Sequence, residues 1–289
     1  MRRNWAPYLF LSPWLILTAI FFVYPFCDSI RLAFYQTNGT KSHVFVGWEN
    51  FVTVLSDPLF WKAVRNTLVF TIVSLSIQLP LSLLLALLLE NSQSRVVTWV
   101  RTLLFSPHLM GGIFVGIMFT VMFLPQYGLV NIAFANLFNL SRETDWLSQP
   151  GLVMPALIIT NLWMYIGFNM IYFLAALQNV DRSLVEAARL DGASRFQVFR
   201  HVKLPAIKPV IIFVVITSTI GSLNLFELPQ ALLRGGGPDD AGLTVVCYLY
   251  NNAFLNADLG TGAAVGWILA MLIFVVSMAQ VRISGAGKE

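Results

Sequence analysis

The sequence predicts an all-helical membrane protein with six transmembrane segments, and three observations support this fold class. Of the 289 residues, 57% are hydrophobic and only 11% are charged, whereas the charged fraction of soluble domains is nearer a quarter. Backbone groups in lipid must pair within their own segment, so each span is expected to be a helix. Six stretches reach the roughly 20 apolar residues that a spanning helix needs; they are about Leu9–Ile30, Thr67–Leu89, Leu103–Leu124, Leu152–Leu177, Val210–Phe226 and Ala263–Val281.

The first segment is expected to remain in the membrane, because it is too long for a signal peptide and no small-residue cleavage site follows it. It contains Asp28 near one end, and the other five segments contain no charged residue. The fifth segment is the shortest and is expected to extend on either side. With no internal repeat or linker, residues 1–289 are predicted to form one transmembrane domain with connecting regions 31–66, 125–151, 178–206 and 227–262.

The distribution of lysine and arginine predicts the orientation of the chain. Twelve of the 18 lie at the two ends of the chain and in the loops after the second and fourth segments: Arg2, Arg3, Arg95, Arg101, Arg182, Arg189, Arg195, Arg200, Lys203, Lys208, Arg282 and Lys288. Positive residues collect on the cytoplasmic side of membrane proteins. Both termini and the region 178–206 are therefore expected in the cytoplasm, with the regions 31–66, 125–151 and 227–262 outside. The net charge of +4 follows from this topology and indicates no nucleic-acid partner.

Enzyme, metal and nucleotide motifs are not found in the sequence. His43, His108 and His201 are scattered singly, without the spacing of metal ligands. The stretch Gly235-Gly236-Gly237-Pro238 lacks the lysine and hydroxyl residue of a phosphate-binding loop, so the chain is not expected to bind ATP or another cofactor. Two cysteines, Cys27 and Cys247, form no disulfide framework; unpaired thiols are expected, and a disulfide remains open because both fall near the outer side.

Two short helices are predicted in the region 178–206. Ser183 and Glu186 fit an S-x-x-E capping box that starts the first helix, and Gly192 suits the left-handed position that ends it. Ser194 and Gln197 repeat the capping pattern for the second helix.

The end of that second helix is predicted at Leu204-Pro205, because the residue before a proline is pushed out of the α region. The region is thus expected to hold two short helices at an angle, joined by a glycine hinge.

The same stretch resembles the EAA motif of the permease subunits of ATP-binding-cassette importers, with Val202 in place of the motif's isoleucine. The resemblance implies the type I importer permease fold and a first short helix that docks on a separate ATPase subunit. The residues that it assigns to this coupling are Ser183, Glu186, Ala187, Ala188, Asp191, Gly192, Leu204 and Pro205. The alternative is an ordinary capped cytoplasmic hairpin, in which Glu186 only satisfies backbone donors.

Further stretches resemble the first permease of carbohydrate importers of the maltose or arabinose-oligomer kind. They are Ala6-Pro7-Tyr8 through Pro13, Phe45-Val46-Gly47-Trp48-Glu49-Asn50-Phe51, Asp57 through Trp61, and Gly235 through Tyr250. This resemblance implies a location in the bacterial inner membrane. It also implies four kinds of partner: a second permease subunit, two ATP-binding subunits that hold ATP and Mg²⁺, an extracytoplasmic sugar-binding protein and a sugar substrate. Which sugar is carried stays open.

Polar residues on two of the segments are the candidates for sugar contact. Asn161, Tyr165 and Phe168 share one helical face, and Thr217, Gly221 and Asn224 follow the same spacing on the next segment. Amides can bond sugar hydroxyls, and aromatic rings can stack on apolar sugar faces. The resemblance assigns the contacts to Asn161, Met164, Tyr165, Phe168, Thr217, Gly221 and Asn224. The alternative for each is helix packing, since small and amide residues also join helices in membranes.

Two other functions remain as alternatives. A secondary transporter driven by an ion gradient usually holds charged residues inside the membrane, and none lies at mid-depth here. A scaffold without transport activity would leave the EAA loop without a purpose. Co-purification of a nucleotide-binding subunit would discriminate among the three.

Overall fold

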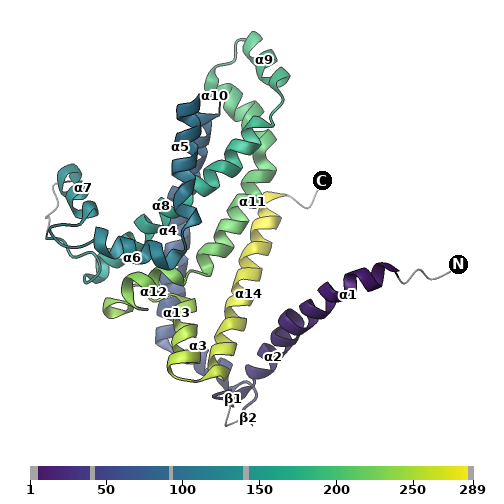
Figure 1. Cartoon of the computed structure of the whole chain (residues 1–289), viewed down its shortest axis with the longest axis vertical. Coiled ribbons are helices and arrows are strands. Elements are labelled where there is room, and N and C mark those ends of the chain that lie inside the picture. The colour runs from purple at the N-terminus through teal and green to yellow at the C-terminus, as the bar shows by residue number, and fades with distance from the viewer. Residues whose placement is uncertain (1–5, 40–42, 91–93, 139–142, 286–289) are drawn as a thin grey trace. The chain divides into compact units, whose positions relative to one another are not determined.

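The computed structural model describes residues 6–39, 43–90, 94–138 and 143–285 (Figure 1). Five residues of the charge count, Arg2, Arg3, Lys41, Arg142 and Lys288, lie outside these ranges, as do the predicted chain ends. The α-helices are α1 (Ala6–Thr18), α2 (Tyr24–Leu32), α3 (Glu49–Ser56), α4 (Pro58–Leu89), α5 (Arg95–Phe105), α6 (Gly112–Met122), α7 (Leu129–Phe138), α8 (Pro150–Gln178), α9 (Arg182–Leu190), α10 (Arg195–Val198), α11 (Leu204–Leu223), α12 (Glu227–Leu233), α13 (Val245–Tyr250) and α14 (Leu259–Ser284).

Shorter elements connect these helices. The π-helical turns are η1 (Ala19–Val23), η3 (Phe199–Lys203) and η5 (Asn251–Leu255), and the 3-10 turns are η2 (Ser106–Leu109) and η4 (Pro238–Asp240). Strands β1 (Tyr35–Thr37) and β2 (His43–Phe45) pair antiparallel, with Tyr35 opposite Phe45. The regions predicted as loops therefore contain much helix.

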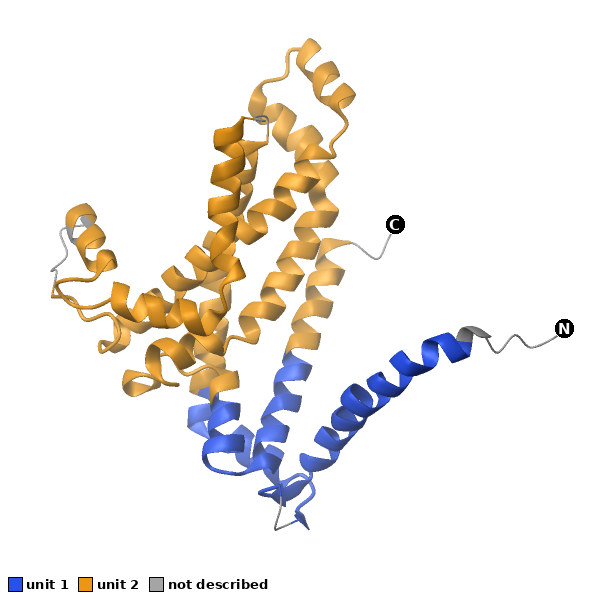
Figure 2. Ribbon diagram, in the orientation of Figure 1, with its two compact units in different colours: residues 1–61, 248–272 blue, residues 62–247, 273–289 orange. Residues whose placement is uncertain are grey.

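The chain divides into two compact units, which Figure 2 colours separately: residues 1–61 with 248–272, and residues 62–247 with 273–289. In the first unit the buried amide of Asn50 donates to the carbonyl oxygens of Ala33 (2.9 Å) and Tyr35 (3.0 Å). The Tyr248 hydroxyl donates to the Asp57 carboxylate at 2.6 Å. The Asn50 bonds hold α3 beside the start of β1, and the Tyr248 bond holds that residue of α13 at the C-terminal end of α3. The assignment of the whole chain to one domain stays a prediction.

The second unit has a core built by close helix contacts. Phe70, Val115, Phe119, Val153 and Leu228 are among its buried side chains. Small residues allow the helix backbones to approach, as is usual in membranes. In α8, a Cβ added at residue 167 would lie 1.8 Å from the backbone oxygen of Leu104 in α5, so only glycine fits there.

Five helical spans in the described ranges are long and apolar enough to cross a membrane: Tyr8–Leu32, Pro58–Leu89, Pro150–Gln178, Arg195–Leu223 and Leu259–Ser284. They contain most or all of the first, second, fourth, fifth and sixth predicted segments. The third differs, because Arg95–Leu109 and Gly112–Met122 meet at a bend of 102°. Met110 and Gly111 both have extended backbone angles, and these two residues break the helix. The expected single helix over Leu103–Leu124 is therefore wrong, and six spans result when the bent pair counts as one.

The predicted helix end at Leu204-Pro205 is also wrong. The chain is helical without interruption from Arg195 to Leu223, and Pro205 lies in the first turn of α11. A proline ring clashes with the carbonyl four residues back in a regular α-helix. Here the preceding turn is π-helical, and the Leu204 N–H donates to Phe199, five residues back. The wider turn moves the preceding carbonyls away from the ring.

Candidate functional site

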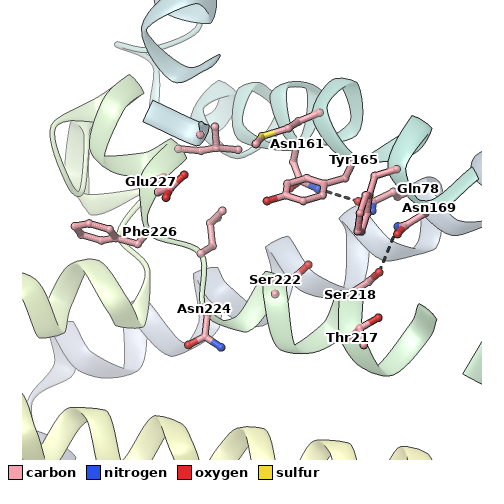
Figure 3. A pocket seen from close by; sticks show the side chains of 16 residues that line it. Gln78, Asn161, Tyr165, Asn169, Thr217, Ser218, Ser222, Asn224, Phe226 and Glu227 are labelled. Carbon is pink, nitrogen blue, oxygen red and sulfur yellow. Dashed lines mark hydrogen bonds between the residues drawn. The ribbon is translucent and has the colours of Figure 1, made fainter. Parts of the chain in front are cut away.

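A cavity of about 390 Å³ lies in the second unit, between α8, α11 and the start of α12 (Figure 3). This volume is within the range of about 300–1,000 Å³ that is usual for small-molecule sites. All seven residues predicted to contact a sugar line it. Those from α8 are Asn161, Met164, Tyr165 and Phe168, and those from α11 and its C-terminal end are Thr217, Gly221 and Asn224. Helical spacing together with the family resemblance thus predicted which residues the fold brings together.

Asn161 takes part in helix packing as well as lining the cavity. It is 5% exposed, and its amide nitrogen donates to the Ser74 hydroxyl (2.7 Å) and to the side-chain oxygen of Gln78 (2.9 Å), both on α4. Buried amides require such partners, because an unpaired polar group in an apolar interior is costly. The amide of Asn161 therefore joins α8 to α4 at the cavity wall.

The aromatic side of the cavity is held by stacked rings. The Phe168 ring stacks on the His108 ring with a centroid separation of 3.8 Å and an angle of 29° between the planes. Tyr172 meets it edge-on at 5.1 Å. His108 belongs to the 3-10 turn η2, just before the helix break, so the bend between α5 and α6 places a ring behind Phe168. Phe168 is thereby a fixed apolar surface.

The α11 side of the cavity is more open. Thr217, Gly221 and Asn224 are exposed, and a Cβ added at Gly221 would meet no atom within 4 Å. The Asn224 amide donates to the Ile220 carbonyl at 2.9 Å, which leaves its second N–H and its oxygen for another partner. Thr217 donates to the Phe213 carbonyl at 2.8 Å and keeps its oxygen as an acceptor.

Sequence reasoning missed other polar residues of the cavity as contacts. Gln78 comes from α4, and Asn169 donates to the Ser218 hydroxyl at 3.3 Å. Glu227 also lines the cavity, although it was expected to belong to a connecting region after the fifth segment. The one signal in the sequence was an acidic residue directly after an apolar span. The contact between Glu227 and Gly112, which positions the carboxylate, could not be predicted from the sequence.

The region 178–206 contains an exposed helix, α9, that carries Ser183, Glu186, Ala187 and Ala188. Its first predicted cap is wrong: the Asp181 carboxylate accepts from the Ser183 backbone N–H at 2.8 Å. Hydrogen bonds from the Ser183 side chain and backbone lower the pKa of the Asp181 carboxyl. Ser183 itself lies inside the helix, where its backbone angles cannot serve as the cap.

The end of α9 and the next helix start agree with the sequence. Gly192 has φ +82°, and the N–H groups of Gly192 and Ala193 donate to Arg189 (3.0 Å) and Ala188 (2.9 Å). These two bonds form the Schellman pattern of a helix end. Ser194 and Gln197 form the predicted capping box at the start of α10. Asp191 is the last residue before the glycine, and Leu204 and Pro205 belong to α11 instead.

No residue of α9 is buried. Leu184 is 56% exposed and Leu190 is 89% exposed, and isolated helices below about 12–15 residues are marginal in water. Beneath α9 lies a polar cavity of about 550 Å³ lined by Arg182, Glu186 and Arg189 and by the ion pair of Glu90 with Lys203. Because Glu186 faces this cavity and caps no helix, the interpretation of it as a simple cap is wrong.

No metal site was expected in this chain, and a disulfide between its two cysteines was left open. Among the described residues, no group of three or more histidine, cysteine, aspartate or glutamate side chains is placed to hold a metal ion. Cys27 is exposed and Cys247 is buried, both as free thiols. The expectation of unpaired thiols stays a prediction.

Comparison with known proteins identifies the family to which this chain is similar. Residues 78–285 match the family described as "Binding-protein-dependent transport system inner membrane component". The chain is 35% identical over 275 residues to the lactose transport system permease protein LacF of Rhizobium radiobacter, covering 94% of this chain and 92% of that protein. It is 35% identical over 287 residues to the arabinooligosaccharides transport system permease protein AraP of Bacillus subtilis (strain 168), covering 98% and 90%.

A solved structure agrees with the sequence comparisons. A chain of a bacterial ABC transporter involved in the import of the acidic polysaccharide alginate superposes with a TM-score of 0.81 and 25% identity, over 99% of this chain and 96% of that one. The predicted fold class, a polytopic importer permease, is confirmed by these matches. The chain belongs to the family of binding-protein-dependent transport system inner membrane components.

Proposed function

We propose that this chain is the transmembrane subunit of an ATP-driven sugar importer and that the sugar passes through the cavity between α8 and α11. The observation that carries the proposal is the cavity itself, where seven residues from two helices combine two amides, two hydroxyl groups and a fixed aromatic surface. Sugars offer hydroxyl groups to such amides and apolar C–H faces to such rings. Relatives named for lactose and arabinooligosaccharides support a saccharide substrate.

The proposed assembly contains a second permease subunit, two ATP-binding subunits and an extracytoplasmic sugar-binding protein. A related transporter structure described with an "alginate pentasaccharide-bound periplasmic protein" supports the last of these partners. The chain itself binds no ATP, Mg²⁺ or other cofactor in this proposal, and ATP is hydrolysed by the partner subunits.

The exposed helix α9 is proposed to dock on an ATP-binding subunit. Its apolar residues Leu184 and Leu190 have no cover from the described part of this chain, and a groove on a partner would bury them. Closure of the two ATP-binding subunits would then move α9, and the cavity would open in turn to the inside and to the outside. An ion-gradient transporter, the other possibility, requires no ATP-binding partner, so co-purification of such a subunit discriminates between the two.

Sugar contact at Asn224 predicts a transport defect without an assembly defect. We expect Asn224→Ala to reduce uptake several-fold, because a lost hydrogen bond to the sugar costs about 0.5–1.5 kcal/mol. Uptake per assembled transporter is measured in proteoliposomes. The matched control is Asn179→Ala at the end of α8, where the amide makes the same local bond, to the Ala175 carbonyl at 3.0 Å, outside the cavity. If Asn224→Ala destabilises the complex while uptake per transporter stays normal, Asn224 is a packing residue.

The charge distribution predicts that residue 236 is outside the cell and residue 195 inside. In a background without Cys27 and Cys247, we expect Gly236→Cys to react with a membrane-impermeant thiol reagent on intact cells. Arg195→Cys is expected to react only after the membrane is permeabilised. Labelling is measured by mass shift of the purified chain. Equal labelling of the two variants on intact cells contradicts the proposed orientation.

A further inference from the structure

Glu227 is the only acidic or basic residue among the 16 described residues that line the α8–α11 cavity. It is the first residue of α12, and its carboxylate lies beside α6. A Cβ added at Gly112 would come within 2.2 Å of the Glu227 Oε2 atom. The glycine therefore leaves the space that the carboxylate occupies, and Figure 3 shows Glu227 at the cavity edge together with Tyr165 and Asn224.

The charge of Glu227 is not cancelled by a neighbouring cation within the described ranges of the chain. The ion pair found there joins Glu90 to Lys203, which line the separate cavity beneath α9. The N-terminal end of α12 favours an acidic side chain at this position, because the first N–H groups of a helix carry partial positive charge. This position at the helix end supplies no positively charged side chain.

We propose that Glu227 makes the cavity selective for neutral saccharides over anionic ones. A carboxylate accepts hydrogen bonds from sugar hydroxyls, and charge-assisted bonds of this kind are strong. Glu227 is exposed to solvent, and the same carboxylate repels a uronate, phosphate or sulfonate group on a sugar that comes within a few ångströms, because like charges repel at that distance even where water reaches them. This inference rests on the proposed function and narrows the substrate to one of the two classes that the relatives' names cover, neutral lactose and acidic alginate.

The local potential can be measured without knowing the sugar. Gly221→Cys, in a background without Cys27 and Cys247, places a thiol in open space on the cavity wall. The purified complex with its partner subunits is treated with two methanethiosulfonate reagents, one bearing a trimethylammonium group and one a sulfonate. We expect the cationic reagent to react faster by about tenfold after correction for a small free thiol, the effect of one nearby charge.

Variants at residue 227 test whether Glu227 causes the faster reaction of the cationic reagent. Glu227→Gln keeps the shape of the side chain and is expected to bring the corrected rate ratio close to one, while Glu227→Asp is expected to keep most of it. A thiol introduced by Arg195→Cys, outside the cavity, serves as the control, and its ratio should be the same with and without the Glu227→Gln substitution. A ratio at residue 221 that Glu227→Gln leaves unchanged overturns the proposal, and Glu227 then only stabilises α12.

A substrate measurement completes the test. The assembled importer is offered lactose, arabinobiose and their analogues with one CH₂OH oxidised to carboxylate, each scored for binding to the permease complex without its binding protein. Tighter binding of a neutral sugar than of its uronate, with the difference lost in Glu227→Gln, supports the proposal. Equal binding of both members of a pair contradicts it while leaving the sugar cavity intact. Binding of no sugar, together with a charge effect in the thiol rates, contradicts the proposed function instead.

Discussion

Gly167→Ala is expected to prevent assembly of a stable importer. The added Cβ would lie 1.8 Å from the Leu104 carbonyl oxygen and 2.9 Å from the Phe105 nitrogen. Both are backbone atoms, so no side chain can rotate away, and α8 must separate from α5. Overpacking of this kind costs roughly 3 kcal/mol at the upper end of measured cases. The separation also withdraws Phe168, the next residue of α8, from the His108 ring that supports it.

The measurement is the yield and thermal stability of the detergent-purified complex by size-exclusion chromatography. Gly151→Ala is the matched control, because it lies on the same helix and an added Cβ there meets no atom within 4 Å. We expect the control to purify like the unchanged protein. A Gly167→Ala complex of normal yield and stability would show that α8 and α5 are further apart than in this structure.

Gly192→Val is expected to uncouple ATP hydrolysis from transport. Gly192 has φ +82°, and a Cβ there would meet no atom within 4 Å, so crowding cannot cause the defect. The defect comes from the backbone, because a β-branched residue is strongly disfavoured at positive φ. Relief of that strain rotates α9 away from its place before Ser194. Sugar-stimulated ATPase activity and uptake of the reconstituted complex should therefore both fall.

The control for this prediction is Gly192→Asn, since asparagine tolerates the left-handed region better than other residues. We expect this variant to keep most of the coupled activity, with Gly192→Ala between the two. Assembly is checked in the same preparations. Normal sugar-stimulated ATPase activity in a fully assembled Gly192→Val complex would refute the role of the glycine turn.

Local chemistry decided which parts of this structure could be predicted from the sequence. Gly192 and the Ser194–Gln197 box involve neighbours in the chain, so their pattern alone fixes the turn and the cap. The first cap of α9 was misplaced because Asp181 and Ser183 are both good capping residues, and nothing in the sequence ranks two such residues that lie so close. The seven cavity residues were predicted by helical spacing together with family resemblance.

Features that depend on tertiary structure were missed. The mean hydropathy of Leu103–Leu124 is high whether or not the helix is continuous, so it does not reveal the two extended residues. Pro107 and the pair Gly111-Gly112 were a sequence signal for a break in the helix. The prediction that the helix ends at Leu204-Pro205 was wrong because a π-helical turn accommodates the proline without ending the helix. Glu227 reaches the cavity only because Gly112 of a different helix leaves room for it. Each miss involves a backbone irregularity or a contact between distant parts of the sequence.

The uninterrupted run from Arg195 to Leu223 has a mechanical consequence. Its 29 residues make a rod of about 40 Å, with the α9 turn at one end and Thr217, Gly221 and Asn224 near the other. A tilt of about 10° about one end displaces the other by roughly 7 Å at this length. A proline that ended the helix at residue 204 would have put a joint in this rod. The π-helical turn keeps the helix continuous, so a displacement of α9 moves the residues at the sugar cavity as part of the same rigid helix.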